Sequence, residues 1–396
     1  MSYFDKSLEI VKFVFTLSGI TYKSKKLNTK EKLIVRSIYY FNFVSVNSDV
    51  VGAVYCFIDG VQTGKTFVEL TYIAPCITFA ILCSLKAFCM FHYKDHVSDL
   101  IDQLRDLDNK RKDESDIKKR ETNFLHAILK ASNIINLMLL LTFCVSPFIL
   151  IAYKYVKTSE VELFLPLLIK YPFDSYDIKY WPYVYVHQFW SVVLVIVNLS
   201  VSDYLLFICC TYLRIQFRFL QKDIREIVTS NRKLTEPELV LLQEKIVNLV
   251  KWHQELIRLT GCLELIYAKS TLYNFVSSSV LICFTGFNVV TIDNVAFTTI
   301  FVVFLSTSLL QIFSLCFFGD LLMESSTEVR NAVYESKWYY TNTKAAKSLL
   351  IIQTRTDNPC KLTAFGFSEV NLKAFMSILS SAWSYFALLK TIYNED

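Results

Sequence analysis

The sequence predicts an all-α membrane protein with seven transmembrane helices, and three observations support this fold class. Apolar residues make up 53% of the 396-residue chain and charged residues only 19%, against about 25% charged in a typical soluble domain. The apolar residues gather in seven segments of the length that a helix needs to cross the hydrocarbon core. The connections between these segments alternate in their content of Lys and Arg, as loops on opposite sides of a membrane do.

Four of the seven segments carry no charge, and three are interrupted by charged residues. The spans in chain order are 34–58, 67–92, 131–153, 180–202, 270–292, 294–319 and 368–392. Asp49, within the first span, and Asp203, at the end of the fourth, are costly at membrane depth. Two readings remain open for them: each side chain faces protein or water inside the bundle, or each lies near a helix end and reaches the interface.

The positive charges predict how the chain is oriented in the membrane. The alternate segments 1–33, 93–124, 213–263 and 320–367 hold 30 of the 41 Lys and Arg residues. Because such residues concentrate on the cytoplasmic side, the amino terminus is expected inside and the carboxyl terminus outside. No cleavable signal peptide is recognisable at the start. This orientation is opposite to that of a G-protein-coupled receptor, and the outer loop 154–183 also lacks cysteine.

These spans divide the chain into successive regions. They are a cytoplasmic amino-terminal segment 1–33, helices one to four in 34–212 with the outer loop 154–183, a cytoplasmic helical extension 213–263, helices five and six in 264–319, a cytoplasmic anchor 320–367, and a last helix with its extracellular tail in 368–396.

The cytoplasmic connections are predicted to be helical. Amphipathic stripes at spacings of three and four run through 93–120, 213–229 and 238–290. The last of these follows Thr235-Glu236-Pro237, a typical helix start. Such stripes pack against one another or other subunits beneath the membrane, or they lie on the bilayer surface. The proline- and aromatic-rich outer loop is expected to form an ordered lid.

No catalytic, metal-binding or cofactor-binding pattern appears in the sequence, so nothing indicates an enzyme. The net charge of +5 is too small to indicate nucleic-acid binding. The eleven cysteines lie mostly within apolar segments and form no disulfide framework.

The last span has two different faces. Small hydroxylated residues and one leucine recur along one of them: Ser377, Ser381, Ser384, Leu388 and Thr391. The opposite face is apolar and consists of Phe375, Leu379, Ala382, Phe386 and Leu389. Serines at this spacing promote close packing within a bundle. Alternatively the hydroxylated face lines water in an oligomer, and a ring of Leu388 side chains closes the path by dewetting.

Four segments are similar to those of a known family. The last span, AFMSILSSAWSYFALLKTIYN, resembles the S-Y-F-x-L-L ending of insect odorant receptors. The H-Q motif before span five is matched in WHQELIRLTGCLE, and the outer P…Y-P-F-D loop in LFLPLLIKYPFDSYDIKYW. The family's C-x-x-G…S…V…A-x-Y…W pattern is matched by Cys316, Gly319, Ser325, Val329, Ala332, Tyr334 and Trp338. The ending differs from those of the shared co-receptor and of gustatory relatives, and Trp383 replaces a more usual Tyr.

The resemblance implies an odorant-tuning subunit of an odorant-gated, non-selective cation channel. In this family four subunits surround one pore built from the last helix, and tuning subunits assemble with the co-receptor in the plasma membrane of sensory-neuron dendrites. By similarity the gate falls at Leu388. The cytoplasmic ends of spans four to seven form a shared anchor, in which His253, Tyr334 and Trp338 are expected to pack. Membrane lipid and a small, mostly apolar volatile are the other implied partners, without a cofactor.

The resemblance also places the odorant pocket in the outer half of the bundle, among spans two, three, four and six. The direction of each span selects its outer half. The candidate ligand-binding residues are Tyr72, Ile73, Cys76, Phe143, Ser146, His187, Trp190, Ser191, Leu194, Thr298, Phe301 and Val302. Ordinary helix packing is the alternative for each of them.

Two other functions fit parts of the sequence. A gustatory-type ligand-gated channel would have the same topology but a more polar pocket. A seven-span metabotropic receptor would need the opposite placement of both termini.

Overall fold

A computed structural model describes residues 2–21, 28–111, 115–229, 231–292 and 295–395. Helices make up most of these ranges. They are α1 (Tyr3–Ser18), α2 (Thr29–Gln62), α3 (Phe67–Thr71), α4 (Ala74–His92), α5 (Lys94–Lys110), α6 (Ser115–Thr158), α7 (Trp181–Arg225), α8 (Glu236–Thr291), α9 (Val295–Glu335), the short 3-10 helix η2 (Trp338–Tyr340), α10 (Thr343–Arg355) and α11 (Leu372–Glu395).

The prediction of seven spans is confirmed. Within the described ranges, seven helical segments are long and apolar enough to cross a membrane, the first of them in α2 and the last in α11. The second span is built from two pieces, because the chain turns at Tyr72 and Ile73 between α3 and α4. Spans three to six are much longer than the membrane requires, so their helices continue well beyond one side of it.

Local sequence signals fix where several helices begin. Thr235 precedes α8, and its backbone N–H donates to the Glu238 carboxylate at 2.7 Å, which completes the capping box expected at Thr235-Glu236-Pro237. Asn371 caps α11 in a similar way, since its side-chain oxygen accepts from the Ala374 N–H at 3.0 Å. The amphipathic segment after the second span forms α5, separated from α4 by Tyr93 alone.

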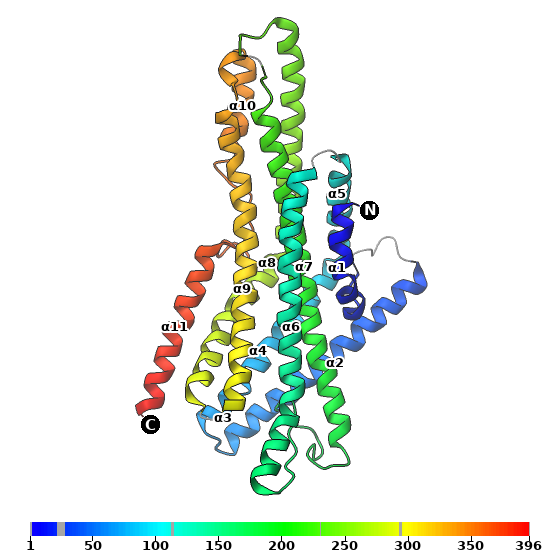
Figure 1. Ribbon diagram of the computed structural model, residues 1–396, viewed down its shortest axis with the longest axis vertical. Coiled ribbons are helices and arrows are strands. Elements are labelled where there is room, and N and C mark those ends of the chain that lie inside the picture. Colours follow the sequence, from blue (N-terminus) through cyan, green and yellow to red (C-terminus); the bar gives the residue numbers. More distant parts are fainter. Residues whose placement is uncertain (1, 22–27, 112–114, 230, 293–294, 396) are drawn as a thin grey trace.

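Helix α7 is the central element of the bundle. Residues 198–213 are all buried by the rest of the chain. The helix contacts α1, α2, α4, α5, α6, α8 and α9, and Figure 1 places it in the middle of the molecule. The other spans pack around it and therefore leave their outer faces free for lipid.

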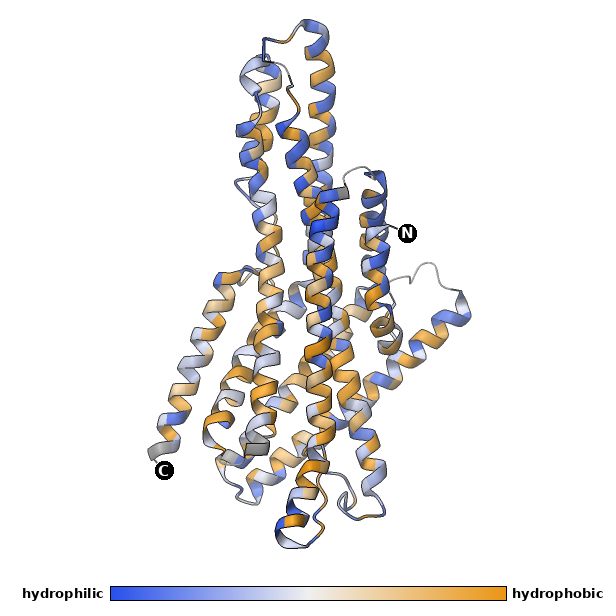
Figure 2. Ribbon diagram, in the orientation of Figure 1, coloured by the Kyte–Doolittle hydropathy of each residue, from blue (hydrophilic) through white to orange (hydrophobic). Residues whose placement is uncertain are grey.

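One end of the bundle is a long helical extension. The ends of α7 and α9 and the start of α8 run together past the other helices, and α10 packs against α8 and α9 there (Figure 1). Polar residues alternate with apolar ones along this extension, whereas apolar residues dominate the middle of the bundle (Figure 2). The stripe of α5 is buried as well, with Leu100, Ile101 and Leu104 in the main core cluster. These stripes pack within the protein instead of lying on a bilayer surface.

The two costly aspartates both face the protein interior. Asp203 on α7 accepts a hydrogen bond from Lys86 on α4 at 2.6 Å and another from Gln311 on α9 at 2.8 Å. Lys86 itself is 1% exposed, so a buried ion pair joins α4 to α7, and the hydrogen bond from Gln311 adds α9. Asp49 on α2 is 6% exposed and lies beside a cavity.

Helix α11 stands at the edge of the bundle, in contact with α8 and α9 (Figure 1). Its approach depends on Gly319 of α9, because a Cβ atom at that position would lie 2.3 Å from the carbonyl oxygen of Val370. The backbone just before α11 therefore packs directly on α9.

Candidate functional site

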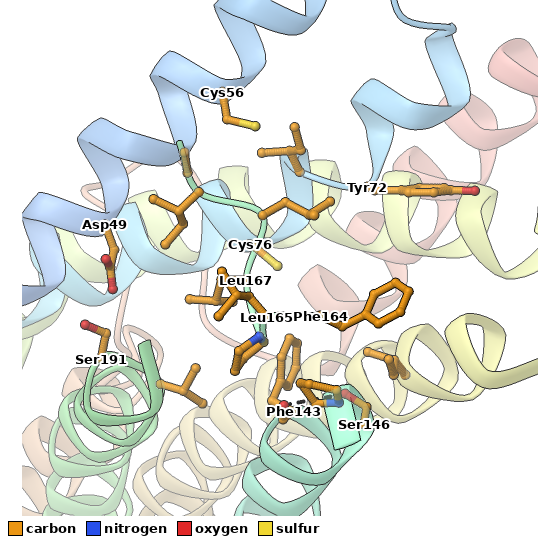
Figure 3. A pocket seen from close by; sticks show the side chains of 18 of the residues that line it. Asp49, Cys56, Tyr72, Cys76, Phe143, Ser146, Phe164, Leu165, Leu167 and Ser191 are labelled. Carbon is orange, nitrogen blue, oxygen red and sulfur yellow. Dashed lines mark hydrogen bonds between the residues drawn. The ribbon is translucent and has the colours of Figure 1, made fainter. Parts of the chain in front are cut away.

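The structure contains a cavity of about 940 Å³ at the end of the bundle opposite the extension. This volume lies near the upper limit of the about 300–1,000 Å³ usual for small-molecule sites. Its walls come from α2, the α3–α4 turn, α4, α6, α7 and α9, and the loop 159–180 closes one side (Figure 3).

Aromatic contacts hold three walls of the cavity together. The ring of Tyr72 lies 5.8 Å from that of Phe301, and Phe304 is 5.1 Å from Phe79 and 6.0 Å from Phe143, measured between centroids. These pairs join α4 and α6 to α9, at distances where aromatic rings attract one another. The walls are therefore large, apolar and mutually supported, which suits a ligand that is mostly hydrocarbon.

The loop 159–180 is held in place as a lid by backbone contacts at several points. The Leu167 N–H donates to the Gln188 side chain at 2.9 Å, and the Trp181 indole N–H donates to the Phe164 carbonyl at 3.0 Å. The Lys170 N–H donates to the Gly52 carbonyl at 3.2 Å. A Cβ atom on Gly52 would lie 2.4 Å from Ile169, so glycine is what lets α2 approach the loop this closely.

Polar groups meet at one edge of the cavity, between α2, α7 and the lid. Asp49 and Ser191 face each other there (Figure 3). The His187 Nδ1 atom lies 3.3 Å from the Asp49 carboxylate and also 3.3 Å from the Tyr171 hydroxyl. Burial raises the pKa of Tyr171 above its usual value, so this phenol stays protonated and can donate a hydrogen bond.

Seven of the twelve residues predicted for the pocket line this cavity. They are Tyr72, Ile73, Cys76, Phe143, Ser146, Ser191 and Phe301.

The other five lie elsewhere. His187 lies 3.3 Å from the Asp49 carboxylate, Trp190 packs on a neighbouring apolar cluster, and Leu194 is fully buried. Thr298 donates to the Ile292 carbonyl at 3.1 Å, and Val302 is 43% exposed on the outside of α9. Which cavity residues touch a ligand stays a prediction.

The predicted pore face of α11 is exposed along its length. Ser377, Ser381, Ser384, Leu388 and Thr391 are all exposed, with Leu388 at 58%. The opposite face packs on the bundle: Ala382 is buried, and the Phe375 ring lies 5.5 Å from Phe313 of α9. The chain thus uses the apolar face of α11 for its own packing and leaves the hydroxylated face uncovered.

The three residues expected to pack in the anchor behave differently from one another. His253 is 5% exposed and its ring lies 6.4 Å from that of Phe217. Tyr334 is 74% exposed and Trp338 43% exposed. Within one chain only His253 is buried, so packing of Tyr334 and Trp338 remains a prediction about contacts between subunits.

Comparison with known proteins identifies the family. The family described as 7tm Odorant receptor matches residues 66–383, most of the chain. The chain belongs to the odorant receptor family. Among curated relatives, putative odorant receptor 92a of Drosophila melanogaster is 27% identical and odorant receptor 67c of the same organism 24% identical. These alignments cover 96% and 98% of this receptor, and 93% and 95% of the two relatives.

Solved structures have the same fold. The insect olfactory receptor OR5 from Machilis hrabei superposes with a TM-score of 0.80 at 14% identity, covering 97% of each chain. A second structure of that protein, in complex with eugenol, gives the same TM-score over 98% of each chain. The likeness confirms the seven-helix fold, and family membership confirms that the chain is a multi-pass membrane receptor and not an enzyme.

Two contributions to the cavity were missed in the sequence. The receptor places Asp49 and its neighbours on α2 in the wall, whereas the sequence predicts a pocket among spans two, three, four and six. Residues 161–169 of the lid also line the cavity. Asp49 is unusual in the sequence because it is a charged residue within an apolar span. No pattern in the sequence indicates how far the lid folds inward.

Proposed function

We propose that this odorant receptor is a tuning subunit of a ligand-gated, non-selective cation channel in the plasma membrane of sensory neurons. A small volatile binds in the cavity beneath the lid. Four subunits, among them the family's co-receptor, surround one pore lined by α11. The amino terminus is cytoplasmic and the carboxyl terminus extracellular, as the distribution of Lys and Arg favours.

The hydroxylated stripe of α11 carries this proposal. Ser377, Ser381 and Ser384 are exposed in the single chain, while the other face of the same helix packs on α8 and α9. Serine gains little from facing acyl chains, but it suits a water-filled path. A single helix cannot enclose such a path, so the proposal requires neighbouring subunits, each contributing the same face.

The cavity and the pore helix are joined through α9. Phe301 and Phe304 of α9 line the cavity, and Phe313 of the same helix packs on Phe375 of α11. A ligand opens the channel only if it binds the open state better than the closed one. In this proposal, filling the cavity shifts α9, and α11 follows and withdraws Leu388 from the axis.

Adjacent leucines of α11 provide a matched test of the gate. Leu388 is 58% exposed on the stripe, and Leu389 is partly buried against the bundle. In cells that express the receptor with the co-receptor, Leu388→Ala is expected to raise the current without odorant, because a shorter side chain weakens dewetting. Leu389→Ala should leave that current low. Equal basal currents in both variants, at equal surface expression, would contradict the proposed gate.

The orientation is tested separately with epitope tags on intact cells. Antibody should reach a tag on the carboxyl terminus and not one on the amino terminus. The reverse result would instead favour a metabotropic receptor.

A further inference from the structure

The polar edge of the cavity differs from the rest of its lining. Among the described residues that line the cavity, Asp49 and Ser191 are the buried polar ones. Lys65, Glu69 and Glu162 also belong to the lining but are exposed, so water screens their charges. A ligand enclosed in the cavity therefore meets one buried acidic group.

The Asp49 carboxylate is poorly satisfied by the protein. Neither of its oxygens accepts a hydrogen bond of good geometry from the described residues, although the side chain is over nine-tenths buried. Buried polar groups without partners are rare in folded proteins because leaving them unpaired is costly. Figure 3 shows the carboxylate directed toward Ser191 at the cavity edge, where a bound molecule could reach it.

The Nδ1 atom of His187 cannot both donate a hydrogen bond to Asp49 and accept one from Tyr171. His187 Nδ1 lies 3.3 Å from both the Asp49 carboxylate and the Tyr171 hydroxyl. If Tyr171 donates to Nδ1, that atom is an acceptor and has no proton for Asp49. If Nδ1 donates to Asp49, only one of the four lone-pair positions of the carboxylate is used. The Ser191 and Tyr171 hydroxyls also interact with the carboxylate. Even with all three neighbours bonded, one of its four lone-pair positions remains for a ligand.

We infer that the cavity selects odorants with an apolar body and one N–H or O–H donor, amines above alcohols, and that Asp49 accepts their hydrogen bond. This inference rests on the proposed function and names the ligand class of the same cavity. In its ionised form the Asp49 side chain is an acceptor only, so it attracts donors and repels carbonyl and ether oxygens. A hydrogen bond to an ionised carboxylate is about twice as strong as one between neutral groups, whichever donor makes it. Amines rank first because a protonated amine adds the Coulombic attraction of its opposite charge.

Ser191 is a supporting donor or acceptor at the same edge. Its hydroxyl lies 3.4 Å from that of Ser45, so it can turn toward either Asp49 or a ligand. The apolar body would lie against Phe143 and Phe301 on the far walls. These rings determine how well the apolar part of the ligand fits, and they do not distinguish between different polar groups at its other end.

The test compares compounds of equal carbon skeleton. Cells expressing the receptor with the co-receptor are exposed to 2-phenylethylamine, 2-phenylethanol and phenylacetaldehyde, and to hexylamine, 1-hexanol and hexanal. The half-maximal concentration for activation is expected to be roughly 10- to 100-fold lower for the donor compounds than for the aldehydes, the range that a hydrogen bond to a charged group supplies.

Two variants separate the polar end from the body. Asp49→Asn keeps the size of the side chain but adds an N–H₂ donor, so it should remove the preference for amines and improve the response to aldehydes. Phe301→Leu is the matched control. It should raise the half-maximal concentration of all six compounds by a similar factor and keep their order of potency. Surface labelling confirms that each variant reaches the membrane.

The possible results distinguish a failure of the inferred ligand class from a failure of the proposed receptor function. Aldehydes that activate the unmodified receptor at lower concentrations than amines and alcohols overturn the inference, and this comparison needs no variant. An unchanged order in Asp49→Asn at normal surface level also overturns it, while the receptor function stands. Silence toward all six compounds and toward a wider volatile panel, with the complex at the surface, contradicts the proposed function itself.

Discussion

The two buried aspartates of this receptor show how the same residue type serves two purposes in one bundle. Asp203 is surrounded by partners: Lys86 at 2.6 Å and Gln311 at 2.8 Å, on two different helices. Asp49 is equally buried, yet its oxygens accept no well-formed hydrogen bond among the described residues. The first joins helices, and the second faces a cavity. The difference teaches that burial of a charge alone does not distinguish a structural group from a binding group; its partners do.

The largest effect on stability is expected when Asp203 loses its partner Lys86. Lys86→Ala leaves a buried carboxylate without its cation, which costs about 3–5 kcal/mol. The thermal unfolding midpoint in detergent and the surface level should fall strongly, whereas Lys130→Ala, at an exposed lysine of α6, should change neither. Lys86→Met combined with Asp203→Leu should recover much of the loss. A stable Lys86→Ala receptor would mean that Asp203 is not held by this pair.

The lid over Asp49 provides an intermediate effect. Gly52→Val introduces a side chain where a Cβ would already lie 2.4 Å from Ile169, and overpacking of this kind costs about 1–3 kcal/mol. The lid should move outward, which admits water to the cavity and raises the half-maximal concentration of every odorant. Gly261→Ala is the control, because its Cβ would meet nothing within 4 Å. Normal odorant responses in Gly52→Val would show that the lid does not need its close contact with α2.

The smallest effect is expected at Asp49, and with the opposite sign. Asp49→Leu removes a buried carboxylate that accepts no well-formed hydrogen bond from the described residues, so the free energy of unfolding should rise by about 1 kcal/mol. The unfolding midpoint of the ligand-free receptor is the measurement. Responses to amines should be lost at the same time, the usual exchange of stability against function at a binding site. A marked fall in the midpoint would indicate that Asp49 is a structural group like Asp203.

Several features followed directly from the sequence. The seven spans were predicted by length and apolar content, and the Thr235-Glu236-Pro237 signal located the start of α8. The two faces of α11 followed from helical periodicity, because residues three and four apart share a face whatever the helix packs against. Seven of the twelve residues proposed for the pocket line the cavity, since the direction of the chain along each span selects the half that borders it.

The remaining features depended on contacts between distant segments. Direction along a span does not fix the rotation of a helix about its axis, which is why Leu194 and Val302 point away from the cavity while Ser191 points into it. The inclusion of α2 in the wall and the folding of the lid against Gly52 depend on packing across more than a hundred residues of chain.

The amino-acid order by itself determined which segments are helical, which are apolar enough for a membrane and which face of the last helix is hydroxylated, because each of these properties is local. Tertiary structure alone decided that Lys86 would meet Asp203 and that Asp49 would line a cavity. Such pairing depends on where separate helices come to rest against α7, and the cost or benefit of a buried charge is set by whichever side chains arrive beside it.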